Sequence, residues 1–103
     1  MPQQFDFRRL DPLIHAPARM AIMSYLAVRD EVSFNELSAR LELTDGNLES
    51  HLRKLEEAGY LRATKSFVER KPHTAYRMLA KGRSAFERYR DELEKITLSR
   101  ERK

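Results

Sequence analysis

The chain has 103 residues, a length that suits one domain whose core is just large enough to support a fold without staples. It contains no cysteine, which excludes disulfides and thiolate metal sites and leads us to expect a reducing, cytoplasmic location. Apolar runs such as Met20–Met23 are far shorter than the roughly 20 residues of a membrane span, and no signal-peptide pattern opens the chain. Three separated histidines make a poor metal set, so we expect neither membrane association nor a metal or other cofactor.

Charge is distributed unevenly along the chain. The net charge is +4 and the isoelectric point is about 9.6. The segment 60–83 carries seven basic residues against one acidic residue, whereas the segment 31–59 carries seven acidic residues against three basic ones. The positive field therefore belongs mainly to the later segment, and it favours a polyanionic partner.

The first part of the chain is expected to form an arm and a helix. Residues 1–9 have no clear period, but Phe5, Phe7 and the following Leu10 are apolar enough to pack on another surface. Pro17 suits the first turn of a helix, because its missing N–H would have no intrahelical partner there. We predict a helix from about Pro17 to Arg29. Helical spacing indicates its buried face: Ala18, Ile22, Met23 and Leu26.

Two further helices follow with a short turn between them. Ser33 and Glu36 form a capping box, which predicts a helix that ends near Leu41. Three residues later Thr44 is a good cap for the next helix, predicted at about 45–58, and this spacing matches a helix-turn-helix. The third helix should bury four residues at spacings of four, three and three: Leu48, Leu52, Leu55 and Ala58.

The remainder is predicted to be a β-hairpin and a long helix. Gly59 supplies a left-handed residue that ends the third helix. The segments 60–68 and 74–79 are rich in aromatic, β-branched and alternating residues, with a basic loop at 69–73 between them. A helix at about 80–98 carries an apolar seam typical of helix pairing: Phe86, Tyr89, Leu93 and Ile96.

The outer side of the third helix has the side chains that a DNA-reading helix needs. A B-form major groove admits one α-helix, and an amide or a guanidinium can bond a base bidentately, so Asn47 and Arg53 are the best candidates for base reading. Thr44, Ser50 and Lys54 are better suited to phosphates, and Gly46 would allow close approach of the backbone. The predicted DNA contacts on this helix are Thr44, Asp45, Gly46, Asn47, Ser50, His51, Arg53 and Lys54.

The hairpin would supply a second DNA contact. Arg70, Lys71 and His73 are expected at its tip, where they can reach the minor groove or its phosphates, with Lys65 and Arg77 flanking them on the strands. Affinity for DNA should then fall steeply as salt rises.

Several features have a second interpretation. A basic hairpin can simply be a solvated edge that resists aggregation. Asp45 and Glu49 would repel phosphates if they faced the groove, and in the second interpretation they serve only to stabilise the dipole of the helix. His51 can be packed or can bond a phosphate, and the seam of the last helix can belong to the core or to an interface.

These residues together resemble the winged helix-turn-helix transcriptional regulators of the MarR and ArsR type, particularly their small sensorless relatives. The resemblance covers roughly Leu10 to Leu98. It is carried by Leu43-Thr44 before the third helix and by four other stretches: 17–19, 50–61, 74–79 and 81–83. One departure is Leu79-Ala80, where such proteins often have a leucine and a capping threonine.

The resemblance implies an α+β winged helix fold, mainly helical with a small hairpin, comprising a core at 10–79 and a C-terminal dimerisation helix at 80–98. It also implies a non-enzymatic homodimer that binds a palindromic double-stranded DNA operator and represses transcription. The dimer contacts would be Phe5, Phe7, Leu10, Phe86, Tyr89, Leu93 and Ile96. The alternative is a winged helix that binds another protein, since fold alone does not decide function. RNA binding lacks exposed stacking platforms, and whether a small effector binds stays open.

Overall fold

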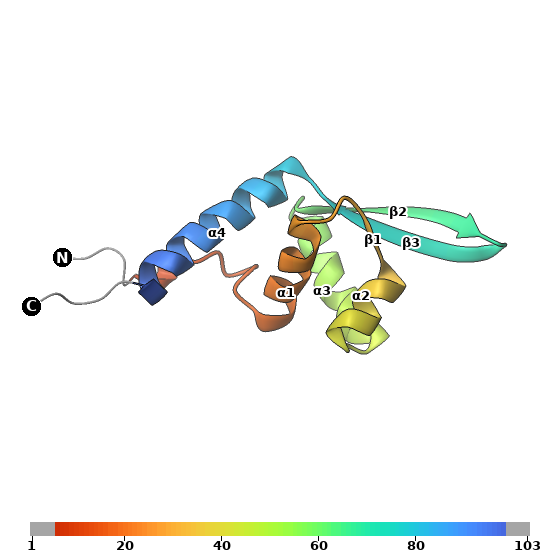
Figure 1. Cartoon of the computed structure of the whole chain (residues 1–103), viewed down its shortest axis with the longest axis horizontal. Coiled ribbons are helices and arrows are strands. Elements are labelled where there is room, and N and C mark those ends of the chain that lie inside the picture. Colours follow the sequence, from red (N-terminus) through yellow and green to blue (C-terminus); the bar gives the residue numbers. More distant parts are fainter. Residues whose placement is uncertain (1–5, 99–103) are drawn as a thin grey trace, which may run out of the picture.

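The computed structural model describes residues 6–98, and within them three α-helices pack against a small antiparallel sheet while a fourth extends away from it (Figure 1). A short 3-10 helix precedes α1. The elements are the 3-10 helix Phe7–Arg9, α1 Pro17–Ala27, β1 Val32–Ser33, α2 Phe34–Leu41, α3 Asp45–Glu57, β2 Leu61–Val68, β3 Lys71–Met78 and α4 Ala80–Leu98. The hairpin of β2 and β3 projects at one end of the long axis and α4 runs toward the other, over extents of 64 × 26 × 20 Å.

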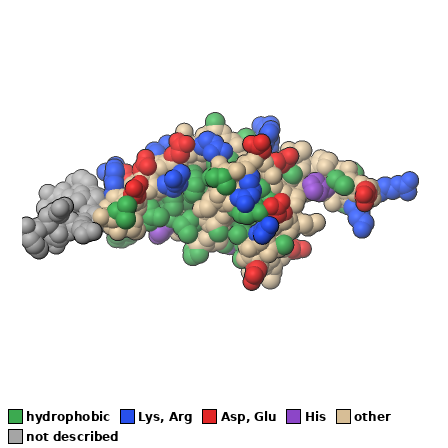
Figure 2. Space-filling model, in the orientation of Figure 1, with side chains coloured by type: hydrophobic (Ala, Val, Ile, Leu, Met, Phe, Trp, Pro, Cys, Tyr) green, Lys and Arg blue, Asp and Glu red, His purple; other side chains and the backbone are tan. Residues whose placement is uncertain are grey.

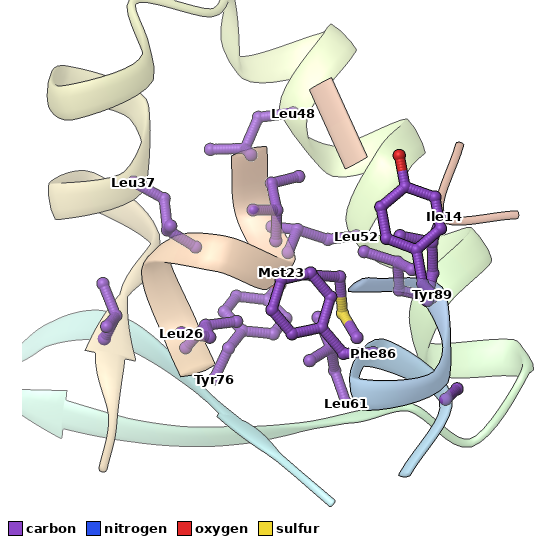
Figure 3. Close-up of a cluster of buried hydrophobic side chains, with 14 of the residues drawn as sticks. Ile14, Met23, Leu26, Leu37, Leu48, Leu52, Leu61, Tyr76, Phe86 and Tyr89 are labelled. Atoms are coloured by element: carbon purple, nitrogen blue, oxygen red, sulfur yellow. The ribbon is translucent and has the colours of Figure 1, made fainter. Parts of the chain in front are cut away.

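The core lies where α1, α2 and α3 meet the root of the hairpin and the first half of α4 (Figure 3). The predicted inward faces of the helices are confirmed, because the leucines of α3 are at most 1% exposed and Ile22, Met23 and Leu26 of α1 are fully covered. Ala18 and Ala58 are half-buried at the margin. The helical spacing in the sequence therefore identified the core-facing sides of α1 and α3.

The predicted helix starts are also confirmed. The Ser33 hydroxyl accepts a hydrogen bond from the Glu36 N–H at 3.0 Å, and α2 begins at the next residue. The Glu36 carboxylate, however, accepts a hydrogen bond from the Tyr25 hydroxyl of α1. Half of the capping box thus serves the packing of α1 against α2. Helix α1 ends at Ala27, two residues before the predicted end at Arg29.

Strand β1 was not predicted. It has only two residues, which pair with Tyr76 and Ala75 of β3, so the sheet order is β1-β3-β2. Two residues are too few to produce an alternating pattern. The strand exists because the chain between α1 and α2 passes beside β3, which makes it a product of tertiary structure.

Two glycines join the end of α3 to the hairpin and to α4. Gly59 has φ +81°, the left-handed conformation predicted for the end of α3. Gly82 of α4 packs on the backbone of Tyr60, and a Cβ at this position would lie 2.3 Å from the Tyr60 carbonyl oxygen. The same carbonyl accepts a hydrogen bond from the Leu79 N–H at 2.9 Å. The direction in which α4 leaves the hairpin is therefore set by a contact that only glycine permits.

The segment before α1 is attached to this junction. The Tyr60 hydroxyl donates a hydrogen bond to the Asp11 carboxylate at 2.6 Å. Burial, together with the bond to Asp11 and its negative charge, raises the pKa of Tyr60 to about 12. Nearby, Arg9 forms an ion pair with Glu92 of α4 at 3.3 Å. The described part of the predicted arm, residues 6–9, is thus held along α4.

Candidate nucleic-acid interface

The third helix presents a polar side to solvent because its apolar side is fixed. Leu48, Leu52 and Leu55 are buried in the core. The Thr44 hydroxyl accepts a hydrogen bond from the Asn47 N–H at 3.2 Å, which confirms the predicted cap. Seven of the eight residues predicted to contact DNA from this helix are exposed: Thr44, Asp45, Gly46, Asn47, Ser50, Arg53 and Lys54.

Asp45, one of the two carboxylates that would repel phosphates, lies at the turn between α2 and α3 and can accept a hydrogen bond from Ser38. The Ser38 hydroxyl of α2 lies 3.2 Å from the Leu43 carbonyl and 3.3 Å from the Asp45 carboxylate, and it can donate to either oxygen. Glu42 adopts φ +54° and ends α2 in the left-handed conformation. Asp45 therefore has a structural role as a link between the two helices, in addition to its favourable position at the positive end of the α3 dipole.

The second carboxylate, Glu49, pairs with Arg53 one turn later at 3.3 Å. Their side chains are 63% and 61% exposed, respectively, and an exposed pair of this kind contributes at most about 1 kcal/mol. Arg53 can exchange Glu49 for a stronger acceptor at little cost. Glu49 thus neutralises the guanidinium in the free protein without blocking it.

The eighth residue, His51, is half-buried and contacts α1. The Arg19 guanidinium donates a hydrogen bond to His51 Nδ1 at 3.1 Å and a second one to the Leu13 carbonyl. Because a guanidinium is always protonated and can only donate, His51 must accept at Nδ1 and carry its proton on Nε2. Burial, with the charges of Arg19 and Lys54, holds the pKa of His51 below its usual 6.5. His51 is therefore a neutral side chain that packs and still has one N–H to donate.

The hairpin differs from the prediction at its tip. Val68 pairs with Lys71, so the turn consists of only Glu69 and Arg70, with φ +52° and +69°. Positive φ at both central residues is the mark of the type I′ turn that matches the twist of a hairpin. The predicted loop at 69–73 was therefore three residues too long. The other side of β3 is unpaired near the tip, since β1 reaches only Tyr76 and Ala75, so a proline is tolerated there.

This correction moves two predicted tip residues onto β3. Lys71 is exposed directly beside the turn. His73 lies opposite Ser66 and is half-buried, lining a small cavity with Phe34 and Asn35 at the start of α2. His73 is therefore near the body of the protein and is separated from the basic tip. Figure 2 shows lysine and arginine side chains at the projecting end of the hairpin, where Arg70 and Lys71 lie.

The strands carry additional positive charge on one face of the sheet. Arg62 and Arg77 lie directly opposite each other, and both are exposed. Like charges at such a position are destabilising, so the pair has no structural benefit of its own. Lys65, on the other face, pairs with Thr74 and is also exposed. An anionic partner would relieve the repulsion between the two arginines.

The predicted dimer contacts need correction. Leu10, Phe86 and Tyr89 are 3–6% exposed and pack in the core of the protomer, because α4 closes the core as well as extending beyond it. Leu93 and Ile96 are half-buried, Phe7 is 70% exposed, and Phe5 lies outside the described residues. What remains uncovered is a groove of about 320 Å³ between α1 and α4, near which hydrophobic side chains gather in Figure 2. Its exposed rim includes Met20 and Val28.

A family model described as "Winged helix DNA-binding domain" matches residues 18–97. The chain belongs to this family. It is also 39% identical over 77 residues to the uncharacterized protein MJ0432 of Methanocaldococcus jannaschii, a match that covers 75% of this chain and 84% of that protein.

Solved structures agree with the family assignment. A transcriptional regulator homologue from Pyrococcus horikoshii OT3 has a TM-score of 0.75 at 32% identity, covering 80% of this chain and 81% of that one. MarR has a TM-score of 0.63 at 21% identity, covering 90% of this chain and 72% of that one, and shows the fold alone. The resemblance to winged helix-turn-helix proteins is therefore confirmed. Within residues 6–98, no helix is long and apolar enough to span a membrane.

Three residues at this interface were missed from sequence. Arg19 contacts His51 across 32 positions of sequence, and no spacing rule connects them. Arg62 was counted with the basic segment but was not assigned a contact, although its pairing with Arg77 follows once the register is known. Phe67, 75% exposed near the tip, was assigned only to a strand. The signal for Phe67 was present, because an aromatic residue next to a basic turn is unusual on a solvated edge.

Proposed function

We propose that this protein is a homodimeric transcriptional repressor that binds a specific sequence of double-stranded DNA. The observation that carries the proposal is the combination of an outward polar side on α3 with a projecting basic hairpin in one winged helix domain. Asn47 and Arg53 would read base edges in the major groove. Thr44, Ser50 and Lys54 would bind phosphates, and Arg70 and Lys71 would reach the minor groove or the phosphates beside it.

The proposed dimer uses the groove between α1 and α4. Val28 is 78% exposed at this groove, and Leu98 at the end of α4 is 67% exposed. A second copy related by two-fold symmetry would cover these side chains and place two α3 helices about 34 Å apart, one turn of DNA. A palindromic operator follows from this arrangement. Repression would result where the operator overlaps a promoter.

A random pool of duplex fragments provides the decisive experiment. We expect selection by the protein to enrich a palindrome with half-sites about 10 base pairs apart. Titration of the selected duplex at two salt concentrations should show a steep loss of affinity at higher salt. Asn47→Ala should weaken binding and relax selection at one base position, whereas Glu57→Ala, a matched change of an exposed residue at the end of α3, should do neither. A pool that stays random after selection would contradict the proposal.

The dimer has its own test. Val28→Glu places a charge in the apolar groove without touching the core, so we expect a monomer in sedimentation and much weaker DNA binding. Ala39→Glu, an equivalent change on the exposed side of α2, should leave the dimer intact. A wild-type protein that sediments as a monomer at micromolar concentration would remove the symmetric operator from the proposal.

A second function, docking on a partner protein, is favoured by one observation. Glu56 and Glu57 are exposed at the end of α3, and they add negative charge to a helix proposed to approach DNA. They lie at the far end of the helix from Thr44 and Asn47. A protein-docking module would form no selective, salt-sensitive complex with duplex DNA, so the same titration separates the two functions.

A further inference from the structure

The projecting end of the hairpin carries an apolar surface as well as positive charge. Phe67 lies directly opposite Pro72, and both side chains are on one face of the hairpin. Phe67 is 75% exposed and Val68, on the other face, is 51% exposed. Large apolar side chains are rarely left uncovered at a strand end, because they promote aggregation. We therefore expect another molecule to cover the exposed apolar surface of Phe67 and Pro72.

The surroundings of this pair indicate a polyanion. Lys65 is on the same face of β2, two residues before Phe67. Arg70 lies in the turn between Phe67 and Pro72, and Lys71 lies beside the turn on the face of Val68. Glu69 is the single acidic residue in the segment 65–73. An apolar side chain with a lysine on its own face and basic residues at the adjoining turn suits a ligand that is charged outside and apolar inside, which describes the stacked bases of a duplex between their phosphates.

The hairpin end is long enough to reach the floor of a minor groove but too wide for an undistorted one. Beyond Lys65, the three residues to Val68 extend about 10 Å at roughly 3.3 Å each, which exceeds the groove depth of about 7.5 Å. The groove is only about 6 Å wide, narrower than a two-stranded ribbon with its side chains. The hairpin end can therefore enter only a groove that has been opened, and a duplex opens its minor groove when an apolar side chain separates two base pairs and kinks it.

The backbone at the tip is restricted on the β3 side. Pro72 fixes its own φ two residues after Arg70, the last residue of the turn, and limits the conformations of Lys71. A rigid end is what a side chain needs if it is to push between base pairs, because a flexible one would yield before the stack does.

We propose that Phe67, supported by Pro72, is a wedge that enters the minor groove, separates a base step and bends the operator. This inference rests on the proposed function and adds to it a deformation of the DNA. Flexible pyrimidine–purine steps open at least cost, so such a step is expected where the hairpin contacts the operator. The protein would thereby recognise sequence at positions that none of its polar side chains contacts.

The test measures bending separately from binding. A selected duplex labelled with a dye at each end reports its end-to-end distance by energy transfer when saturated with protein. The wild-type protein should bend it by several tens of degrees, within the range of about 20–90° seen for apolar wedges. Phe67→Ala should straighten the complex and weaken binding about tenfold, an effect the size of one lost stacking contact. Phe67→Leu, which keeps an apolar wedge, should restore most of the bend.

Two controls make the result specific. Val68→Ala changes the neighbouring side chain on the opposite face and should leave the bend unchanged. Arg70→Ala should lower affinity and salt dependence while the saturated complex stays bent. Since Phe67 is exposed, thermal melts of all four variants should match the wild type within a few degrees.

The outcomes distinguish the two proposals. A selective, salt-sensitive complex that is straight, or one whose bend survives Phe67→Ala, would overturn the wedge and leave the DNA-binding function intact; the exposed phenylalanine would then be available to a protein partner. No selective complex with the wild type would overturn both.

Discussion

Helix α3 and the β-hairpin would face the same partner, but they are held in place by different forces. Three buried leucines fix α3, so burial determines where its outer side chains point. In β2 every residue after Ala63 is exposed, and the hairpin end is held by its backbone ladder and its turn. In α3, therefore, the residues that form the core and the residues proposed to contact DNA are different, and each set can be changed without the other. In the hairpin the same residues form the turn and are proposed to contact DNA.

The largest expected effect is loss of the support under α3. Leu52→Ala should lower the free energy of unfolding by about 2–5 kcal/mol, because it removes a fully buried side chain and leaves a cavity. Chemical denaturation measures this. Ser50→Ala, two residues away on the exposed side, should change it by less than about 0.5 kcal/mol. Equal losses of stability for the two changes would mean that the exposed side of α3 contributes to folding as much as its buried side does.

The next effect concerns the junction of the hairpin with α4. Gly82→Ala introduces a Cβ that would lie 2.3 Å from the Tyr60 carbonyl oxygen, so backbone must move. We expect a loss of about 1–3 kcal/mol in unfolding free energy, typical of overpacking. Ser84→Ala, an exposed change in the same turns of α4, is the matched control and should be close to neutral. If Gly82→Ala is as stable as the wild type, the contact does not set the direction of α4.

A smaller effect of opposite sign is expected at the hairpin turn. Glu69→Asn combined with Arg70→Gly supplies the residues that favour positive φ, and should raise the free energy of unfolding by about 1 kcal/mol. The same variant should bind DNA more weakly, with a salt dependence shallower by about one phosphate contact per subunit. Arg70→Ala, which loses the charge but keeps the unfavourable turn, should lose affinity without gaining stability. A stabilised variant with unchanged DNA affinity would show that Arg70 is not a contact.

The smallest effect is the pH dependence contributed by His51. Burial and the charges of Arg19 and Lys54 lower its pKa in the folded protein, so the unfolded chain binds more protons below pH 6.5. Stability from the neutral side chain is therefore present above pH 6.5 and is lost as the pH falls below it. Thermal melts at pH 7.5 and 5.5 should show a larger drop for the wild type than for His51→Gln. An equal drop in the two proteins would mean that His51 is as easily protonated folded as unfolded.

Local rules predicted α3 and failed at the hairpin tip, for a physical reason. A helix start depends on residues three apart, such as Thr44 and Asn47, and its buried side depends on spacing within the same helix, so both are visible in the sequence. The turn at Glu69-Arg70 contradicts local preference, since both residues adopt positive φ without being glycine or asparagine. The register of the two strands imposes that turn, and register is a property of two segments together.

At the candidate site, too, some features were predictable from residue spacing and others appeared only in the structure. Spacing alone identified the exposed side of α3, and seven of its eight predicted contacts are exposed. The structure alone joined Arg19 to His51, placed Arg62 opposite Arg77 and moved His73 away from the tip.

The apolar seam of α4 shows what residue spacing cannot predict, namely which surface packs against the seam. The spacing of its apolar residues predicted correctly that one side of α4 is buried. The same spacing occurs whether that side packs on the core of its own protomer or on a second copy of the chain. Phe86 and Tyr89 are taken by the protomer's own core, while Leu93 and Ile96 are only half-buried beyond it. By itself the sequence determined the helices, the caps of α2 and α3, the inward faces of α1 and α3 and the site of excess positive charge, because these depend on neighbours along the chain. Tertiary structure decided what covers each apolar face and which charges meet, because those contacts join residues whose separation no local rule encodes.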